Sequence, residues 1–251
     1  MENIESIINK PAGSLIKTTL VDFPGLVAST IFLEGCNLRC PYCYNKSLVQ
    51  PDKQFSNNAK DRDYICSTAG EVINHLEKRK NVLGGFVISG GEPLLNSATP
   101  FLIKKAKELG LKVKLDTNGT LPGLLKNLIE NSETRPDYIA MDLKTTPERY
   151  IEMNPMKVDY SKKLLESIKI ISKFPKENRE WRTVLVPTLA GKEEIQKISE
   201  LLPEDAQWFF AHFRNENCID PHFNEISPYL DSEEEELLEI ARKRIPGAAI
   251  R

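Results

Sequence analysis

Three features that mark common protein classes are missing from this sequence. No apolar run approaches the roughly 18 residues of a membrane span, and the longer ones, such as Val27–Leu33, have the length of a strand. The first residues, Met1 to Glu5, lack the apolar core of a signal peptide. Charge of one sign is not in excess, since 34 basic residues stand against 36 acidic ones. We therefore expect a cytoplasmic protein with no membrane partner and no nucleic-acid partner.

Cysteine is also scarce, and the few cysteines lie unevenly. Three of the 5 fall between Cys36 and Cys43, whereas Cys66 and Cys218 stand apart. An odd number of clustered cysteines does not suit a disulfide framework, and thiols stay reduced in the cytoplasm. None of the 3 histidines lies near the cluster in sequence. The clustered cysteines are therefore predicted to be metal ligands.

Strand-length apolar segments alternate with amphipathic segments along most of the chain. The predicted strands are Val27–Leu33, Phe86–Ser89, Lys112–Asp116, Tyr138–Asp142, Arg182–Pro187 and Gln207–Phe213. The predicted helices are Thr68–Arg79, Ala98–Leu109, Leu121–Asn131, Lys162–Lys173, Glu193–Leu202 and Glu233–Lys243. Gly110 is predicted to stop the second helix and Ser232 to cap the last one. Because parallel neighbours need a crossover connection, this order predicts an α/β fold, an incomplete (β/α)6 TIM-like barrel.

The sequence predicts a single domain over residues 1–251, because no Gly/Ser-rich or Pro-rich linker divides it. Within this domain we expect an N-terminal extension over 1–26 and the partial barrel over 27–213. A C-terminal segment over 214–251 is expected to end in the final helix. The polar stretch Gln50–Asp63 is predicted to form a loop.

Polar and glycine residues recur where the predicted strands end. In parallel sheets and barrels, active sites collect at the carboxyl ends of the strands. These ends carry Gly35-Cys36, Gly90-Gly91-Glu92-Pro93, Asp116-Thr117-Asn118-Gly119, Asp142-Leu143-Lys144 and Pro187-Thr188. The sequence therefore predicts an active-site rim at this edge.

The clustered cysteines follow the pattern Cys-x3-Cys-x2-Cys in the loop after the first predicted strand. Thiolates are the ligands that iron–sulfur clusters require, and a short loop can wrap three of them around one cube. A fourth local cysteine is absent, so one iron would lack a protein thiolate. The alternatives are three unligated thiols or a structural zinc site, which Cys66 or Cys218 would have to complete.

Two motifs together resemble those of the radical S-adenosylmethionine (SAM) superfamily. One is the cysteine pattern with Tyr42 directly before its last cysteine, and the other is Gly90-Gly91-Glu92-Pro93. The resemblance implies that Cys36, Cys40 and Cys43 bind three irons of a [4Fe–4S] cluster while SAM chelates the fourth. It also implies that the backbone of Tyr42 faces the adenine of SAM. Gly90, Gly91 and Glu92 would meet the methionine amine of SAM.

The resemblance extends to one type within the superfamily, the glycyl-radical-enzyme activases. Val21-Asp22-Phe23-Pro24-Gly25 and the segment from Phe32 to Asn45 look like the opening of these activases. Asp116-Thr117-Asn118-Gly119 and Asp142-Leu143-Lys144 are similar to motifs shared with pyruvate formate-lyase activase. Phe213-Arg214-x3-Cys218-Ile219-Asp220-Pro221 is similar to the anaerobic ribonucleoside-triphosphate reductase activating proteins, which the chain resembles most.

This resemblance implies an anaerobic oxidoreductase reaction. A flavodoxin- or ferredoxin-like donor would reduce the cluster, and SAM would be cleaved to methionine and a 5′-deoxyadenosyl radical. That radical would take a hydrogen atom from a glycine of a partner enzyme, here anaerobic ribonucleotide reductase. Asp116 resembles the activase position that helps to bind a monovalent cation, with a simple strand-end turn as the alternative. Asn118 is a candidate for an amide contact to SAM.

Other functions stay open at this point. A radical SAM enzyme could act on a small molecule, as 7-carboxy-7-deazaguanine synthase-like enzymes do, or it could activate pyruvate formate-lyase. A third class is a non-catalytic iron–sulfur or zinc module. Metal analysis separates this class from the enzymes, and a glycine-centred radical on a partner separates an activase from a small-molecule enzyme.

Overall fold

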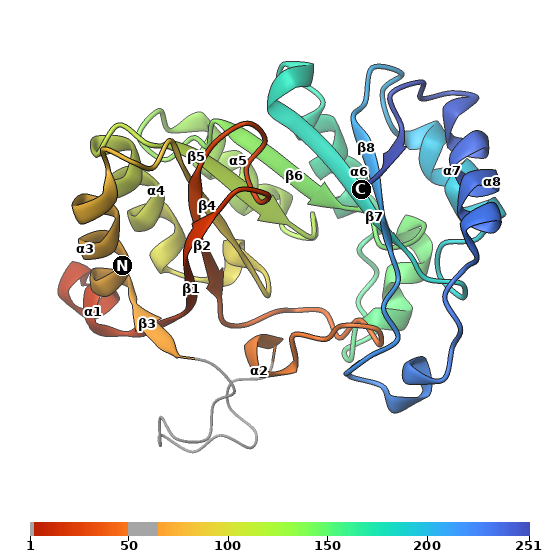
Figure 1. Ribbon diagram of the computed structural model, residues 1–251, viewed down its shortest axis with the longest axis horizontal. Helices are drawn as coiled ribbons and strands as arrows, with labels where there is room; N and C mark the ends of the chain where they lie inside the picture. The colour runs from red at the N-terminus through yellow and green to blue at the C-terminus, as the bar shows by residue number, and fades with distance from the viewer. Residues whose placement is uncertain (1–2, 50–64) are drawn as a thin grey trace. The chain divides into compact units, whose positions relative to one another are not determined.

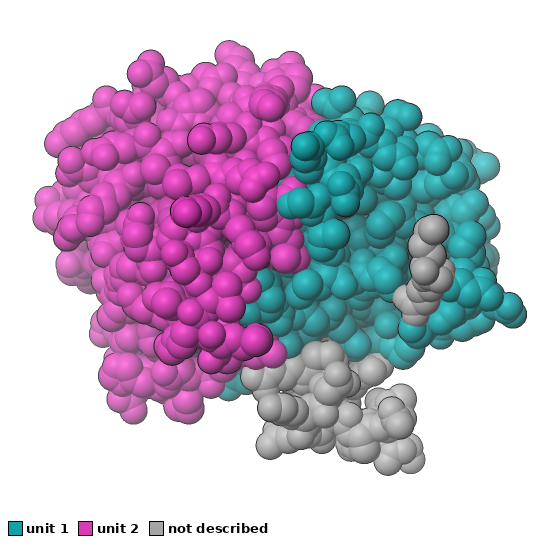
Figure 2. All heavy atoms as spheres, turned by 180° about the vertical axis from the view of Figure 1, so that it is seen from behind, with its two compact units in different colours: residues 1–37, 45–117, 123–138 teal, residues 38–44, 118–122, 139–251 magenta. Residues whose placement is uncertain are grey.

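The computed structural model describes residues 3–49 and 65–251, so the loop predicted at Gln50–Asp63 lies outside the described residues. The chain divides into two compact units (Figure 2). Unit 1 comprises Met1–Asn37, Asn45–Thr117 and Gly123–Tyr138, and unit 2 comprises Leu38–Tyr44, Asn118–Pro122 and Ile139–Arg251.

The strands of unit 1 pair in the order β3-β1-β2-β4-β5 (Figure 1). They are β1 (Pro11–Thr19), β2 (Ala28–Leu33), β3 (Cys66–Thr68), β4 (Gly85–Gly90) and β5 (Lys112–Thr117). Neighbours β2, β4 and β5 are parallel, whereas β1 is antiparallel to both β2 and β3. Almost every residue of β2 is buried, as expected for a parallel strand covered on both faces. The parallel part of the sheet therefore forms the core of this unit.

One helix of unit 1, α1 (Ile4–Asn9), precedes its strands, and the others follow a strand. These are α2 (Lys46–Val49), α3 (Ala69–Arg79), the 3-10 helix η2 (Pro93–Leu95), α4 (Ala98–Glu108) and α5 (Pro122–Glu130), although Pro122 itself belongs to unit 2. Thr68, expected inside a helix, is the N-cap of α3, because its hydroxyl accepts a hydrogen bond from the Glu71 amide and the Glu71 carboxylate accepts one from the Thr68 amide. Gly110 ends α4 as predicted, with a positive φ of 80°.

Unit 2 contains the strands β6 (Tyr138–Asp142), β7 (Arg179–Leu185), β8 (Trp208–His212) and β9 (Ala249–Ile250), each parallel to the next, although Tyr138 itself belongs to unit 1. Its helices are η3 (Pro147–Met153), α6 (Ser161–Ile171), η4 (Lys176–Asn178), α7 (Lys192–Leu201), η5 (Pro221–Asn224) and α8 (Asp231–Arg242). Trp181, Trp208 and Phe210 are fully buried along β7 and β8. Helices α7 and α8 pack side by side (Figure 1).

The α/β prediction is confirmed, and each of the six predicted strands has a counterpart in β2, β4, β5, β6, β7 or β8. Strands β1, β3 and β9 were not predicted. The cap predicted at Ser232 is wrong, because α8 begins at Asp231 and its N-cap is Leu230, whose amide donates to the Glu233 carboxylate at 2.7 Å. In the part of the chain that the structure describes, no helix has the length and apolar character of a membrane span.

Candidate functional site

In unit 1, the Gly90–Glu92 segment lies against the residues that lead into the cysteine motif. Gly90 is opposite Leu33 in the β2–β4 register. Beyond that pair, the Gly91 amide donates to the carbonyl of Leu33 at 2.9 Å and the Glu92 amide to the carbonyl of Gly35 at 2.8 Å. The two predicted motifs therefore meet where the first one begins, directly before Cys36.

Gly91 makes this close approach possible because it has no side chain. A Cβ at Gly91 would lie 2.1 Å from the carbonyl oxygen of Gly35 and 3.2 Å from the Cβ of Cys36. Gly90 is constrained in a second way, since its φ is +120° and a Cβ there would lie 2.3 Å from the amide nitrogen of Leu33. Both glycines are therefore required by the local backbone geometry.

Replacing Gly91 by alanine is expected to lower the free energy of unfolding by about 2–3 kcal/mol. The added methyl group would clash with backbone atoms of Gly35, which cannot move away as a flexible side chain can. It is also expected to lower the iron content after reconstitution, since the displaced backbone carries Cys36. Urea denaturation followed by circular dichroism measures the first effect. Gly123→Ala is the matched control, because nothing lies within 4 Å of a Cβ there and α5 accepts alanine. Equal unfolding midpoints for Gly91→Ala and the wild type would contradict the geometry.

Glu92 is fully buried, and its carboxylate already organises the end of β4. One of its oxygens, Oε1, accepts a hydrogen bond from the Thr117 hydroxyl at 2.9 Å and another from the Leu94 amide at 3.1 Å. These bonds hold the carboxylate at the carboxyl ends of β4 and β5. A buried carboxylate at this place suits a positively charged ligand group.

Asp116 lies beside a basic side chain that the sequence analysis missed. Its Oδ2 accepts from the Ser89 hydroxyl at 2.9 Å, and its Oδ1 lies 3.5 Å from the ammonium of Lys114. The same ammonium donates to the carbonyl of Asp22 at 2.8 Å. Lys114 thus supplies a positive charge next to Asp116, and the monovalent cation there stays a prediction.

The lead-in motif around Asp22 has a packing role in unit 1. The Asp22 carboxylate accepts from the Thr30 hydroxyl at 2.6 Å. Phe23 is buried against Tyr138, with ring centroids 5.9 Å apart, and its ring would clash with any side chain at Gly85. The motif therefore closes one end of the unit 1 core.

In unit 2, backbone hydrogen bonds fix the cysteine loop, residues 38–44. The amide of Cys43 donates to the carbonyl of Cys40 at 3.0 Å, which makes a tight turn. The Arg39 amide donates to the Met153 carbonyl at 2.7 Å. The loop also accepts two bonds from the segment after β8, from Ile219 to Cys43 at 2.9 Å and from Asp220 to Pro41 at 2.9 Å.

The C-terminal motif Phe213–Pro221 thus holds the cysteine loop in place. Its Phe213 ring meets the buried Tyr42 ring edge-on, with centroids 6.5 Å apart. Cys218 is fully buried, its amide donates to Asn224 Oδ1 at 2.9 Å, and its thiol donates to the Arg214 carbonyl. These contacts indicate a structural role for Cys218, because a buried cysteine packs like a small hydrophobic residue.

A charged cluster follows β6 in unit 2. Asp142 pairs with Arg182 at 2.8 Å and with Lys144 at 3.3 Å. Burial opposes ionisation of Asp142, but the charges of Arg182 and Lys144 outweigh it and hold the pKa of this carboxyl at about 2. Burial likewise disfavours the Lys144 ammonium, yet Asp142 keeps the pKa of Lys144 well above its usual range. Tyr150 completes the cluster, donating to the Asp142 carbonyl at 3.0 Å.

The remaining candidate, Asn118, is buried in the turn after β5. Its Oδ1 accepts from the amide of Thr120 at 3.0 Å and from the hydroxyl of Thr120 at 2.6 Å. This oxygen therefore shapes the turn, and the contact of Asn118 to SAM stays a prediction. None of the five cysteines, all of which lie in the described residues, forms a disulfide. Across residues 3–49 and 65–251, no three His, Cys, Asp or Glu side chains are arranged to hold a single metal ion.

Comparison with known proteins relates this chain to a single enzyme superfamily. The family model of the Radical SAM superfamily matches residues 30–202. A protein of Methanocaldococcus jannaschii, named as a glycyl-radical enzyme activating enzyme, is 31% identical over 240 residues, which cover 94% of each chain. The pyruvate formate-lyase-activating enzyme of Clostridium pasteurianum is 31% identical, over 73% of this chain and 72% of its own length. The 7-carboxy-7-deazaguanine synthase of Aquifex aeolicus is 28% identical, over 72% and 77%.

Among solved structures, SuiB of Streptococcus suis bound to S-adenosylmethionine matches with a TM-score of 0.60 at 18% sequence identity. The match covers 86% of this chain and 48% of SuiB, so the chain spans about half the length of that protein. At this identity the likeness concerns the fold. It fits the predicted partial TIM-barrel type with a mostly parallel sheet.

Proposed function

The chain belongs to the radical SAM superfamily, and we propose that it is an activase that generates a glycyl radical on a partner enzyme. The enzymes of this superfamily use a [4Fe–4S] cluster and SAM. When bound, these two groups supply an electron and a 5′-deoxyadenosyl radical. Residues 30–202, which the family model matches, run through both units, and this supports a single radical SAM domain.

The residues of the cysteine motif fit an iron–sulfur cluster. Cys36, Cys40 and Cys43 are not tied up in disulfides in the described structure, and thiolates are the donors that such clusters take. What supports this fit most is the close approach of Gly91 to Gly35 and Cys36, which leaves no room for a side chain. We propose that these three cysteines hold the cluster and that the backbone bonds to residues 39–43 keep the loop in shape.

The residues around β4 fit the polar end of SAM. The buried Glu92 carboxylate suits the methionine amine, and Gly90 and Gly91 permit close approach of the ligand to the backbone. We propose that Tyr42 faces the adenine through its backbone. Asn118 is proposed to add an amide contact, and Asp116 to bind a monovalent cation beside Lys114.

The activase role is supported by the relative from Methanocaldococcus jannaschii, which matches the chain over nearly its whole length. We propose anaerobic ribonucleotide reductase as the partner, because Phe213–Pro221 resembles the corresponding segment of its activating proteins. A flavodoxin- or ferredoxin-like protein is proposed as the electron donor. The Aquifex relative favours the second candidate, a radical SAM enzyme that acts on a small molecule.

The proposal predicts that the reconstituted protein, reduced with dithionite, converts SAM to 5′-deoxyadenosine and methionine. Cleavage of SAM needs only the cluster, the ligand and an electron, so the reaction is expected without any partner. Liquid chromatography of the products measures it, with unreduced protein as the control. If fully reconstituted and reduced protein forms no 5′-deoxyadenosine, catalysis fails and the non-catalytic module becomes the better hypothesis.

A further inference from the structure

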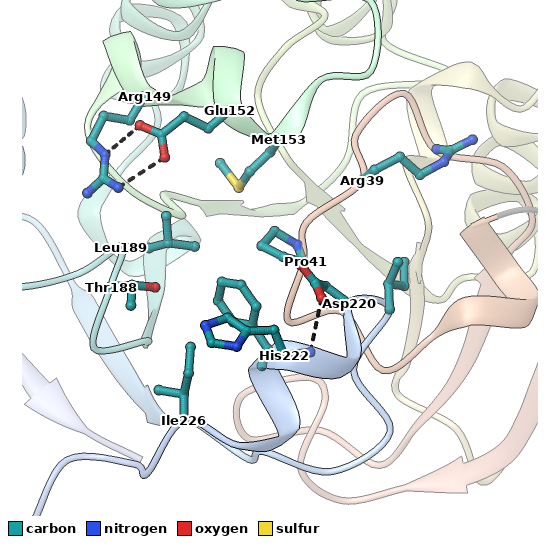
Figure 3. Close-up of a pocket in the computed structure, with 12 residues that line it drawn as sticks. Arg39, Pro41, Arg149, Glu152, Met153, Thr188, Leu189, Asp220, His222 and Ile226 are labelled. Carbon is teal, nitrogen blue, oxygen red and sulfur yellow. Dashed lines mark hydrogen bonds and ion pairs between the residues drawn. The ribbon is translucent and has the colours of Figure 1, made fainter.

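The positive charges of the chain differ in how far water screens them. At the rim of a pocket of about 470 Å³ in unit 2, the Arg149 guanidinium bonds to the Glu152 carboxylate at 2.8 and 3.0 Å (Figure 3). The Arg149 side chain is 30% exposed, so solvent screens its charge. In unit 1, by contrast, the side chain of Lys114 is only 4% exposed. Because a buried charge is screened much less, the Lys114 ammonium acts strongly on the groups beside it.

The Lys114 ammonium lies between the lead-in motif and the end of β5. It donates to the carbonyl of Asp22 at 2.8 Å, and it lies over the face of the Tyr138 ring, 5.7 Å from the centroid. A carbonyl oxygen and a ring face carry partial negative charge, so they hold the ammonium without neutralising it. A full negative charge lies on the Asp116 carboxylate, whose Oδ1 is 3.5 Å from the ammonium. The positive charge of Lys114 therefore compensates the negative charge of Asp116.

Both oxygens of the Asp116 carboxylate have a neighbour in unit 1. Oδ2 accepts a hydrogen bond from the Ser89 hydroxyl at 2.9 Å, and Oδ1, which faces Lys114, is shut off from solvent. A monovalent cation bound to this carboxylate would lie close to the Lys114 ammonium. Two like charges that are close together repel each other, and burial strengthens the repulsion. Lys114 therefore lowers the affinity of Asp116 for a further cation.

A positive charge is needed at this end of unit 1 if a ligand with a carboxylate is to bind there. Besides Asp116, the buried Glu92 carboxylate lies at the same place, bonded to the hydroxyl of Thr117. SAM carries a carboxylate next to its amine, and two acidic side chains would repel that carboxylate. A bound cation or a basic side chain can offset the repulsion. Lys114 is such a side chain, and it is part of the chain at every salt concentration.

We propose that Lys114 provides most of this compensation and so sets a low affinity of Asp116 for monovalent cations. SAM binding then responds to Na⁺ or K⁺ only at high concentrations of the cation. This inference rests on the proposed function, which assigns SAM and a monovalent cation to this site. Lys114 acts through Asp116 and does not need to touch SAM. It therefore determines the cation requirement of binding rather than the chemistry.

The test measures the dissociation constant of SAM for the reconstituted, unreduced protein by equilibrium dialysis, so that no turnover is involved. KCl is compared with tetramethylammonium chloride, whose cation is too large to approach a carboxylate closely, at about 0.15 M of either salt. Lys114→Gln removes the charge and keeps an N–H group for the Asp22 carbonyl, whereas Lys114→Arg keeps the charge. Lys112→Gln is the matched control, because Lys112 lies in the same strand, pairs with Asp137 at 2.9 Å and is 65% exposed. Urea denaturation and iron analysis verify that each variant folds and carries the cluster.

The wild type, Lys114→Arg and Lys112→Gln are each expected to bind SAM equally well in the two salts, within about twofold. Lys114→Gln is expected to bind SAM about tenfold or more weakly than the wild type in tetramethylammonium chloride. In KCl its affinity is expected to recover, because K⁺ at Asp116 replaces the missing positive charge.

A strong response of the wild type to KCl would overturn the inference while the cation site stands, and this measurement does not depend on the folding of any variant. Wild-type affinity of Lys114→Gln in both salts would also overturn it. So would weak binding by Lys114→Gln in both salts, which would give Lys114 a merely structural role. If the wild type binds no SAM in either salt, the proposed function fails first and this inference with it.

Discussion

Alanine at any one of Cys36, Cys40 and Cys43 is expected to remove the iron–sulfur cluster and with it all measurable cleavage of SAM. Each thiolate would bind a different iron, so the loss of one leaves two protein ligands for a cluster that needs three. Anaerobic reconstitution of the wild type should give about four irons and four sulfides per chain. Iron and sulfide analysis, the cluster absorption band and 5′-deoxyadenosine formation measure the loss.

The other two cysteines are the matched controls for this experiment. Cys66 lies in β3, where its thiol donates to the Glu34 carboxylate at 3.5 Å, and Cys218 is buried with a hydrogen bond to the Arg214 carbonyl. Cys66→Ala and Cys218→Ala are therefore expected to keep the cluster, and the latter to lose some stability. Stoichiometric zinc in the wild type, with no cluster after reconstitution, would defeat the assignment of the three clustered cysteines.

The strands of the parallel core could be predicted because their sequence signal is local. Ile31 and Leu33 in β2 belong to a short apolar run, which is typical of a strand buried on both faces. Strand β1 carries a weaker signal, since Lys17 and Thr18 in its second half are exposed. Its place in the sheet depends on pairing with β2 and β3, which no local pattern encodes.

The sequence identifies residues of the candidate site, but it does not show which residues contact one another there. The three cysteines and the Gly90–Glu92 segment carry motifs that a single sequence reveals. The bond from Ile219 to Cys43 joins residues that lie far apart in the chain and uses only backbone atoms, so no side-chain pattern marks it. Lys114 was missed for another reason. A lysine in a strand is normally expected at the surface, whereas this one is buried.

Addition of anaerobic ribonucleotide reductase to the reduced, SAM-loaded protein is expected to produce a glycine-centred radical, seen as a doublet by electron paramagnetic resonance. The partner's glycine would give one hydrogen atom from its Cα to the 5′ carbon of the 5′-deoxyadenosyl radical, which leaves as 5′-deoxyadenosine. This transfer requires near van der Waals contact, so the target loop of the reductase must enter the site. Cleavage of SAM is expected to accelerate at the same time, because the radical is consumed by a productive step.

The reductase with alanine in place of its radical-bearing glycine is the control. The Cα of alanine carries a methyl group in place of one hydrogen, and the site need not accept that methyl group. This variant is expected to bind and to give no doublet. Pyruvate formate-lyase is included because the chain is similar to the pyruvate formate-lyase-activating enzyme of Clostridium pasteurianum. A radical on pyruvate formate-lyase but not on the reductase would show that the reductase is the wrong partner, while the activase function would stand. If neither enzyme acquires a radical although SAM is cleaved, the activase proposal is wrong. A small-molecule substrate, as favoured by the Aquifex relative, is then the function to test.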